Sequence, residues 1–186
     1  MAVLTLATQS AVDTKALAAA LAELAQPGDL LILAGDLGAG KTAFTQGFGR
    51  ALGVDEQITS PTFTLHREYR GRLDLNHLDV YRLGRLAELA DVGLAEMLET
   101  AAVTVIEWGD AVAQALPSDY LEIRLRFGAG DDARIIEIEP FGAVWSARYE
   151  GVRAALGSWV VTADEVESPG RLSSERLDDD GRIPGC

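Results

Sequence analysis

The stretch LLILAGDLGAGKTAFTQGFGRALG, residues 30–53, joins an apolar run, a glycine-rich turn and a helical pattern in that order. The apolar residues 30–34 are typical of a buried strand, and residues 41–52 are typical of a helix that Gly53 ends in a left-handed conformation. Between them, GDLGAGKT fits G-x-x-x-x-G-K-[ST], which binds phosphate when it lies between a strand and a helix. The sequence therefore predicts a phosphate-binding loop, and its Lys41 is one of only two lysines in the chain.

Each residue type in this loop has a chemical reason. Gly35, Gly38 and Gly40 permit backbone dihedrals closed to other residues and let N–H groups approach phosphate oxygens. The helix that begins at Lys41 directs the positive end of its dipole at the same anion, and the lysine can reach the β and γ phosphates. The Thr42 hydroxyl can bind Mg²⁺. We therefore expect nucleotide contacts from Gly35, Asp36, Leu37, Gly38, Ala39, Gly40, Lys41, Thr42 and Ala43.

ATP with Mg²⁺ is the expected cofactor pair. A guanine-specific [NT]-K-x-D motif is excluded, because the only other lysine, Lys15, precedes the loop. Hydrolysis or phosphoryl transfer also needs a carboxylate at a strand end, to hold the metal or orient water. Asp79 and Glu107 each end an apolar strand, in LNHLDV and VTVIEW. We predict Lys41, Asp79 and Glu107 as catalytic residues and Thr42, Asp79 and Glu107 as metal ligands, with the direct ligand among the two acids left open.

Composition limits the class of protein. With 186 residues, of which 48% are hydrophobic, the chain is long enough for one domain with a substantial core. A net charge of −13 opposes attraction to phosphate backbones, so we expect any contact with tRNA to be indirect. The single cysteine, Cys186, allows no intrachain disulfide. The amino terminus resembles no signal peptide and no apolar run is long enough to span a membrane, so a cytoplasmic protein without membrane contact is expected.

Strands and helices alternate along the chain, which favours an α/β fold. Strands are expected at residues 3–6, 30–34, 101–108, 120–127 and 133–140, with the last two antiparallel, and a hairpin at residues 62–69 and 72–81. Helices are expected around Leu17, Leu21 and Leu24, with Ser10 or Asp13 as the cap, and at residues 41–52, 85–99, 111–116 and 143–156.

The last thirty residues differ from the rest. Residues 157–186 are polar, acidic and aperiodic, so a disordered tail is expected, and its removal should cost little stability. Residues 1–156 then form the P-loop ATPase domain.

Four motifs together carry a resemblance to a known family. GDLGAGKT, TSPTFTL (residues 59–65), HLDVYRL (residues 77–83) and EW (residues 107–108) resemble, in order and spacing, the bacterial TsaE family, over about residues 3–156. The family is the ATPase component of tRNA threonylcarbamoyladenosine synthesis. The resemblance implies a three-layer P-loop fold with a central mixed sheet flanked by helices, and weak ATP hydrolysis. It also implies TsaB and TsaD as partners, which modify the adenosine beside the anticodon.

The resemblance assigns further residues. In the family, SPT(F/Y)TL behaves like a switch segment near the phosphates, which here implies nucleotide contacts from Ser60 and Thr62. It places Asp79 and Glu107 at the metal and the γ-phosphate, and Trp108 beside the nucleotide.

Three further residues in or near these motifs have structural as well as functional interpretations. His66 stands where the family commonly has valine, and we interpret it as a surface or core residue. His77 is interpreted mainly as packing or hydrogen bonding at a strand end. Arg82 either stabilises the γ-phosphate or pairs with an acid.

Two other classes remain open from sequence alone. A small-molecule P-loop kinase would share the loop, but it usually closes an arginine-bearing lid over the phosphates, and the second half of this chain predicts a hairpin instead. A non-hydrolysing scaffold would use ATP only to order the switch segment for a partner.

Overall fold

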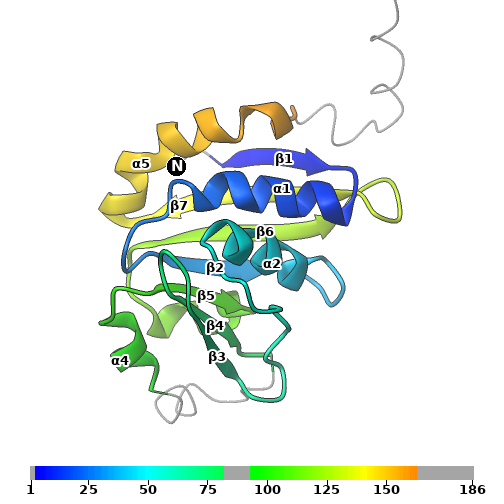
Figure 1. Ribbon diagram of the computed structural model, residues 1–186. Helices are drawn as coiled ribbons and strands as arrows, with labels where there is room; N and C mark the ends of the chain where they lie inside the picture. Colours follow the sequence, from blue (N-terminus) through cyan, green and yellow to red (C-terminus); the bar gives the residue numbers. More distant parts are fainter. Residues whose placement is uncertain (1–2, 82–92, 163–186) are drawn as a thin grey trace, which may run out of the picture.

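The computed structural model describes residues 3–81 and 93–162, which form one sheet flanked by helices (Figure 1). The seven strands lie in the order β1-β7-β6-β2-β5-β4-β3. They are β1 (Leu4–Thr8), β2 (Leu30–Ala34), β3 (His66–Tyr69), β4 (Leu75–Asp79), β5 (Val103–Glu107), β6 (Tyr120–Phe127) and β7 (Arg134–Phe141). The described helices are α1 (Ala11–Ala22), α2 (Lys41–Ala51), α4 (Leu94–Leu98) and α5 (Gly142–Ala155), with 3-10 helices η1 (Gly109–Ala115) and η2 (Gly157–Trp159).

The sheet is mixed, as predicted. β2 lies between β5 and β6 and is parallel to both, and β4 is parallel to β5. The pairs β3–β4, β6–β7 and β1–β7 are antiparallel, so the two expected hairpins are present. The carboxyl ends of β2, β4, β5 and β6 therefore meet at one edge, where ligands bind in open α/β sheets.

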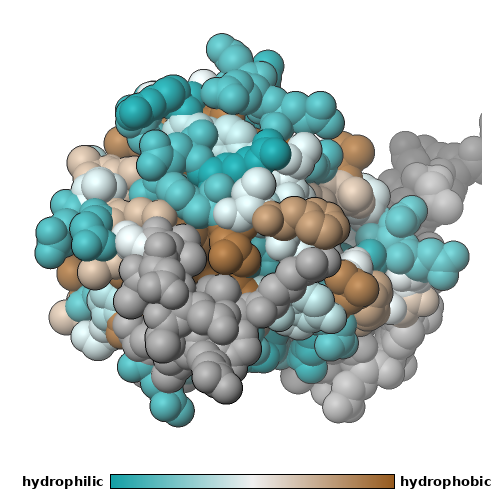
Figure 2. Space-filling model, turned by 90° about the horizontal axis from the view of Figure 1, so that it is seen from below, coloured by the Kyte–Doolittle hydropathy of each residue, from teal (hydrophilic) through white to brown (hydrophobic). Residues whose placement is uncertain are grey.

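Helices cover both faces of the sheet and make three layers. Successive residues of β2 point to opposite faces, so Leu31 and Leu33 belong to one core cluster while Leu30 and Ile32 belong to another. The first cluster includes the buried faces of α1, α2 and α5, and the second includes residues of α4 and η1. The predicted three-layer α/β fold is confirmed. Seen from the β3 end, the surface is largely hydrophilic with separate hydrophobic patches (Figure 2).

Close packing fixes α2 behind the carboxyl edge. A Cβ at Gly47 of α2 would lie 2.3 Å from the backbone oxygen of Lys15 in α1, so only glycine permits this helix contact. Ser10 is the cap of α1, since its hydroxyl accepts from the Asp13 N–H at 3.1 Å. Arg148 of α5 donates to both carboxylate oxygens of Asp29, at 2.6 and 2.9 Å, and ties α5 to the loop before β2.

Several predicted boundaries were wrong. The first strand extends to Thr8. Residues 62–65 form a turn rather than a strand, in which the Leu65 N–H donates to Pro61 O at 2.6 Å and Leu65 adopts a positive φ of 64°. The helix expected at 111–116 is a 3-10 helix that begins at Gly109 and ends at Ala115. Of the expected helix at 85–99, only α4 is seen, because residues 82–92 lie outside the described part.

The folded domain extends beyond Leu156. Residues after it continue into η2, where the Trp159 indole N–H donates to Asp13 at 2.7 Å. Val160 bridges to Leu6 of β1, and the Val161 N–H donates to Thr5 O at 3.0 Å. The expected tail is therefore ordered over its first residues, because a lone tryptophan and one bridge leave no periodic pattern in the sequence. Among the described helices, none has the length and apolar character of a membrane span.

We predict that a chain ending at Leu156 is less stable than one ending at Thr162 by about 1–3 kcal/mol. The shorter chain loses the Trp159 packing and its hydrogen bond to Asp13, and uncovers the edge of β1. Urea unfolding of both chains beside the full-length protein measures the difference. Equal midpoints for the two truncations would contradict it.

Candidate functional site

The glycine-rich loop, residues 35–40, turns from β2 into α2 at the carboxyl edge of the sheet. Gly35 has φ of 133°, and a Cβ there would lie 2.2 Å from Leu125 O of β6, so no other residue fits. Gly38 and Gly40 also have positive φ, of 81° and 108°. Gly40 is the N-cap of α2 and supplies no side-chain acceptor, so the first N–H groups of the helix are available to an anion.

Lys41 lies buried beside this loop, with 5% of its surface exposed. Its Nζ donates to Gly35 O at 2.6 Å and to Asp36 O at 2.9 Å. The same ammonium lies 3.6 Å from the ring centroid of Trp108, a cation–π contact. Burial lowers the pKa of Lys41, and the nearby carboxylates of Glu107 and Asp79 oppose this shift. Both hydrogen-bond acceptors of the ammonium are uncharged carbonyls, so an anionic ligand would be a stronger partner for it.

Trp108 reaches Lys41 because the chain reverses sharply after β5. Its φ of 62° is unusual for a residue with a side chain, and its N–H donates to Leu33 O at 2.8 Å. The Tyr81 ring packs against the indole with centroids 4.8 Å apart. The two aromatic rings close one side of the site.

Parallel pairing of β4 with β5 places Asp79 directly opposite Glu107. Glu107 is 3% exposed and accepts from the Thr42 hydroxyl, at 3.0 and 3.2 Å to its two oxygens. His77 Nε2 lies 2.9 Å from Glu107 Oε1, and because a carboxylate only accepts, the imidazole is the donor. His77 is fully buried, and its Nδ1 has no hydrogen-bond partner among residues 3–81 and 93–162. The hydrogen-bonding role interpreted for His77 therefore has a definite partner.

Asp79 accepts hydrogen bonds from the segment for which the family resemblance implies a switch role. Its Oδ2 accepts from the hydroxyls of Ser60 and Thr62, at 3.0 and 2.5 Å. Its Oδ1 accepts from the Tyr81 N–H at 3.0 Å, and its own N–H donates to Leu65 O at 3.0 Å. The carboxylate is 2% exposed, so these donors replace the water it lost on burial.

These groups line a single cavity of about 500 Å³. Its lining consists of Leu37, Gly38, Gly40, Lys41, Thr42, Ala43, Ser60, Thr62, Asp79, Tyr81, Glu107 and Trp108. Three residues expected to contact nucleotide are absent from this lining. Gly35 and Asp36 instead present carbonyls to Lys41, and Ala39 lies buried in the first core cluster. Tyr81 was missed, although it lies within the HLDVYRL motif, and Arg82 lies outside the described residues.

The cavity matches the chemistry of a phosphate–magnesium pair. Backbone N–H groups and Lys41 can bind phosphate oxygens, while Thr42, Glu107 and Asp79 supply hard oxygen ligands. Mg²⁺ commonly takes one or two carboxylates together with substrate phosphates and water. Within residues 3–81 and 93–162, no group of three or more His, Cys, Asp or Glu side chains could hold a metal alone. Thr42, Glu107 and Asp79 together are an oxygen set of the kind that could hold Mg²⁺ beside a phosphate ligand.

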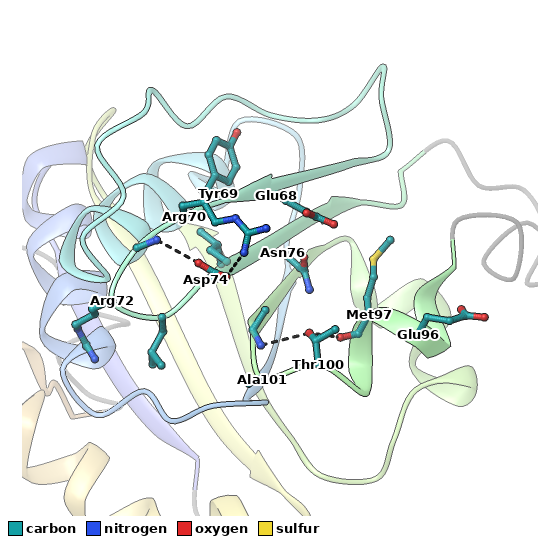
Figure 3. Close-up of a pocket in the computed structure, with 14 residues that line it drawn as sticks. Glu68, Tyr69, Arg70, Arg72, Asp74, Asn76, Glu96, Met97, Thr100 and Ala101 are labelled. Atoms are coloured by element: carbon teal, nitrogen blue, oxygen red, sulfur yellow. Dashed lines mark hydrogen bonds and ion pairs between the residues drawn. The ribbon is translucent and has the colours of Figure 1, made fainter.

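A second hollow, of about 600 Å³, lies between the β3–β4 hairpin and α4 (Figure 3). No residue predicted for the site lines it. Its Arg70 pairs with Asp74 inside the hairpin loop, and the Thr100 hydroxyl donates to Met97 O at 2.7 Å. These contacts lie within the hairpin loop and beside the end of α4, and no residue of the four motifs takes part in them.

Comparison with known proteins identifies the family. The model for "Threonylcarbamoyl adenosine biosynthesis protein TsaE" matches residues 8–136. This chain belongs to the TsaE family. TsaE proteins are associated with the biosynthesis of threonylcarbamoyladenosine in tRNA.

Individual TsaE relatives agree with this assignment. The tRNA threonylcarbamoyladenosine biosynthesis protein TsaE of Bacillus subtilis is 45% identical over 131 residues, covering 70% of this chain and 81% of the relative. That of Treponema pallidum is 44% identical over 128 residues, covering 69% and 95%. The crystal structure of Bacillus subtilis YdiB superposes with a TM-score of 0.71 at 37% identity, over 82% of this chain and 95% of that one. The fold and the motif-bearing region are therefore shared with solved and curated proteins.

We predict that His77 and Glu107 stabilise the fold as a coupled pair. A double-mutant cycle with His77→Leu and Glu107→Leu should give a coupling free energy of about 1–3 kcal/mol, because each single variant removes one partner of this buried hydrogen bond. Urea unfolding of the four proteins measures it. The matched control is the exposed pair Arg70 and Asp74, where we expect below about 1 kcal/mol. A coupling no larger than that of the exposed pair would refute the assignment.

Proposed function

We propose that this chain is a magnesium-dependent ATPase that acts in the threonylcarbamoylation of tRNA adenosine next to the anticodon. The observation that carries the proposal is the convergence of the glycine-rich loop, Lys41 and two buried carboxylates on one cavity. Membership of the TsaE family supplies the tRNA modification as the process.

The loop and the lysine would bind the triphosphate. The N–H groups at the start of α2 would donate to phosphate oxygens. These N–H groups have no partner within the helix, so binding phosphate would break no helical hydrogen bond. Lys41 donates to two uncharged carbonyls in the structure, and exchanging one of them for a charged phosphate oxygen strengthens the contact. Trp108 would keep water from the far side of the ammonium.

Glu107 and Asp79 would have different roles, one at the metal and one at the attacking water. Thr42 and Glu107 already touch, so they would hold Mg²⁺, which when bound would neutralise charge on the phosphate oxygens. His77 would keep the Glu107 carboxylate turned toward Thr42. Asp79 would position the Ser60 and Thr62 hydroxyls near the terminal phosphate and orient the attacking water.

The output would be a change in a binding surface. The segment from Ser60 to Leu65 is tied to the site through Asp79, and its Phe63 is 85% exposed. Leu37, on the glycine-rich loop, is 77% exposed beside the cavity. Such apolar side chains suit a protein partner, which we propose to be the TsaB–TsaD pair, engaged in the ATP state and released after weak, partner-stimulated hydrolysis. With a charge of −13, the chain would meet tRNA only through these partners.

We expect Lys41→Ala to reduce ATP hydrolysis about a hundredfold or more, because it removes the cationic side chain that lines the cavity. The rate of steady-state ADP release measures hydrolysis, and a circular dichroism spectrum like that of the wild type shows that the variant is folded. Lys15→Ala is the matched control, since Lys15 is the other lysine of the chain and lies outside the cavity lining. Full activity in the Lys41 variant would refute the site.

We also expect TsaB and TsaD to bind this protein at least about tenfold more tightly with ATP than with ADP. Linkage then requires that they tighten ATP binding by the same factor. Titration calorimetry with each nucleotide tests this, with tRNA alone as the comparison that should neither bind tightly nor raise hydrolysis. Equal affinity of TsaB and TsaD for the ATP-bound and ADP-bound protein would refute the switch mechanism. Tight binding of tRNA alone would contradict the charge argument.

A further inference from the structure

Arg134, the first residue of β7, contacts the outer side of the glycine-rich loop. Its Nε donates to Ala39 O at 2.9 Å, and its Nη2 donates to Gly38 O at 3.3 Å. Its Nη1 donates to Asp131 O and Ala133 O, at 2.9 and 2.7 Å, in the turn between β6 and β7. One guanidinium thus joins this turn to a loop 95 residues earlier in the chain.

The contact with Ala39 O sets the direction of a neighbouring N–H group. In a trans peptide, the carbonyl and the N–H of the next residue point in opposite directions. The structure has no cis peptide bond in its described residues. When Arg134 holds the Ala39 carbonyl on the outer side, the Gly40 N–H must point the other way, and Gly40 lines the cavity.

The Arg134 hydrogen bonds, which we call the Arg134 clamp, restrict rotation of the peptide between Ala39 and Gly40. Gly38 and Gly40 have positive φ of 81° and 108°, and glycine passes between such conformations at little cost. The Gly38 carbonyl is held by the same guanidinium, and the N–H of that peptide, on Ala39, donates to Asp36 O at 3.1 Å. Two successive peptides of the loop are therefore fixed from outside.

The geometry also separates Arg134 from a phosphate ligand. Its Nε, Nη1 and Nη2 all donate to backbone carbonyls. The Phe127 ring lies 4.8 Å from the guanidinium carbon and packs against this group. A guanidinium engaged on three sides has little capacity left for an anion.

We propose that Arg134 is a positioning residue that orients the Gly40 N–H into the cavity before a phosphate ligand arrives. The role rests on the proposed binding of nucleotide at the glycine-rich loop. Arginine is required because its planar guanidinium donates to the two loop carbonyls and to the carbonyls of the β6–β7 turn at the same time. The single ammonium of a lysine cannot reach all of these groups.

The test uses full-length Arg134→Lys and Arg134→Gln beside wild type. The control is Arg126→Lys on the adjacent strand, whose guanidinium pairs with Glu137. Calorimetry with Mg²⁺–ADP and with inorganic tripolyphosphate measures binding. Amide hydrogen exchange of residues 38–42 in the ligand-free proteins measures loop order. We expect both Arg134 variants to bind both ligands about tenfold to a hundredfold more weakly, with faster exchange confined to the glycine-rich loop and the β6–β7 turn that Arg134 joins, and an unchanged control.

The outcomes separate the alternatives. Unchanged exchange in the free protein with weakened binding would mean that Arg134 contacts the ligand, which overturns the positioning role. Faster exchange across the whole sheet would mean a general structural role and would overturn it too. Wild-type affinity in both variants would also refute it. If the wild type binds neither ligand, the proposed function fails, while loop exchange still tests the clamp.

Discussion

The contact between Gly35 and the backbone of Leu125 is the constraint on which the site depends. A side chain at this position would overlap the β6 carbonyl, so the turn after β2 follows one path across the sheet edge. That path sets the Gly35 and Asp36 carbonyls toward Lys41 and starts α2 with its N–H groups exposed to the cavity. It also brings the loop within reach of the β6–β7 turn. Packing of Gly47 on α1 then holds α2 from behind.

Four ionisable side chains around this loop are buried. Lys41, His77, Asp79 and Glu107 are each 5% exposed or less. Burial of a charged group is costly unless partners replace its hydration, and most of the partners come from the site itself. Thr42 and His77 donate to Glu107, while Ser60 and Thr62 donate to Asp79. Apart from His77 Nδ1, the polar groups of these four side chains have hydrogen-bond partners within the described residues, so a ligand that binds Lys41 or the carboxylates would exchange for some of these contacts.

The sequence predicted the parts of this architecture that local chemistry determines. Glycine spacing located the loop, and apolar strand ends located Asp79 and Glu107, which β-sheet register places side by side. What it could not predict depends on contacts between distant segments. The Arg134 clamp joins positions 95 residues apart and leaves no periodic trace. The pairing of His77 with Glu107 needed the strand order, since either residue alone is compatible with ordinary core packing. Trp159 was assigned to the tail for the same reason, because one indole contact has no local signature.

The two borders of the sheet also have a consequence for solubility. Exposed strand edges offer unpaired backbone groups to other chains and promote aggregation. Here the β1 border is partly occupied by the segment at Val160, which bridges to Leu6. The opposite border is β3, a strand of only four residues that carries His66, Arg67 and Glu68. A short, charged border is a poor template for another strand, so edge-to-edge pairing between copies of this chain is disfavoured at β3.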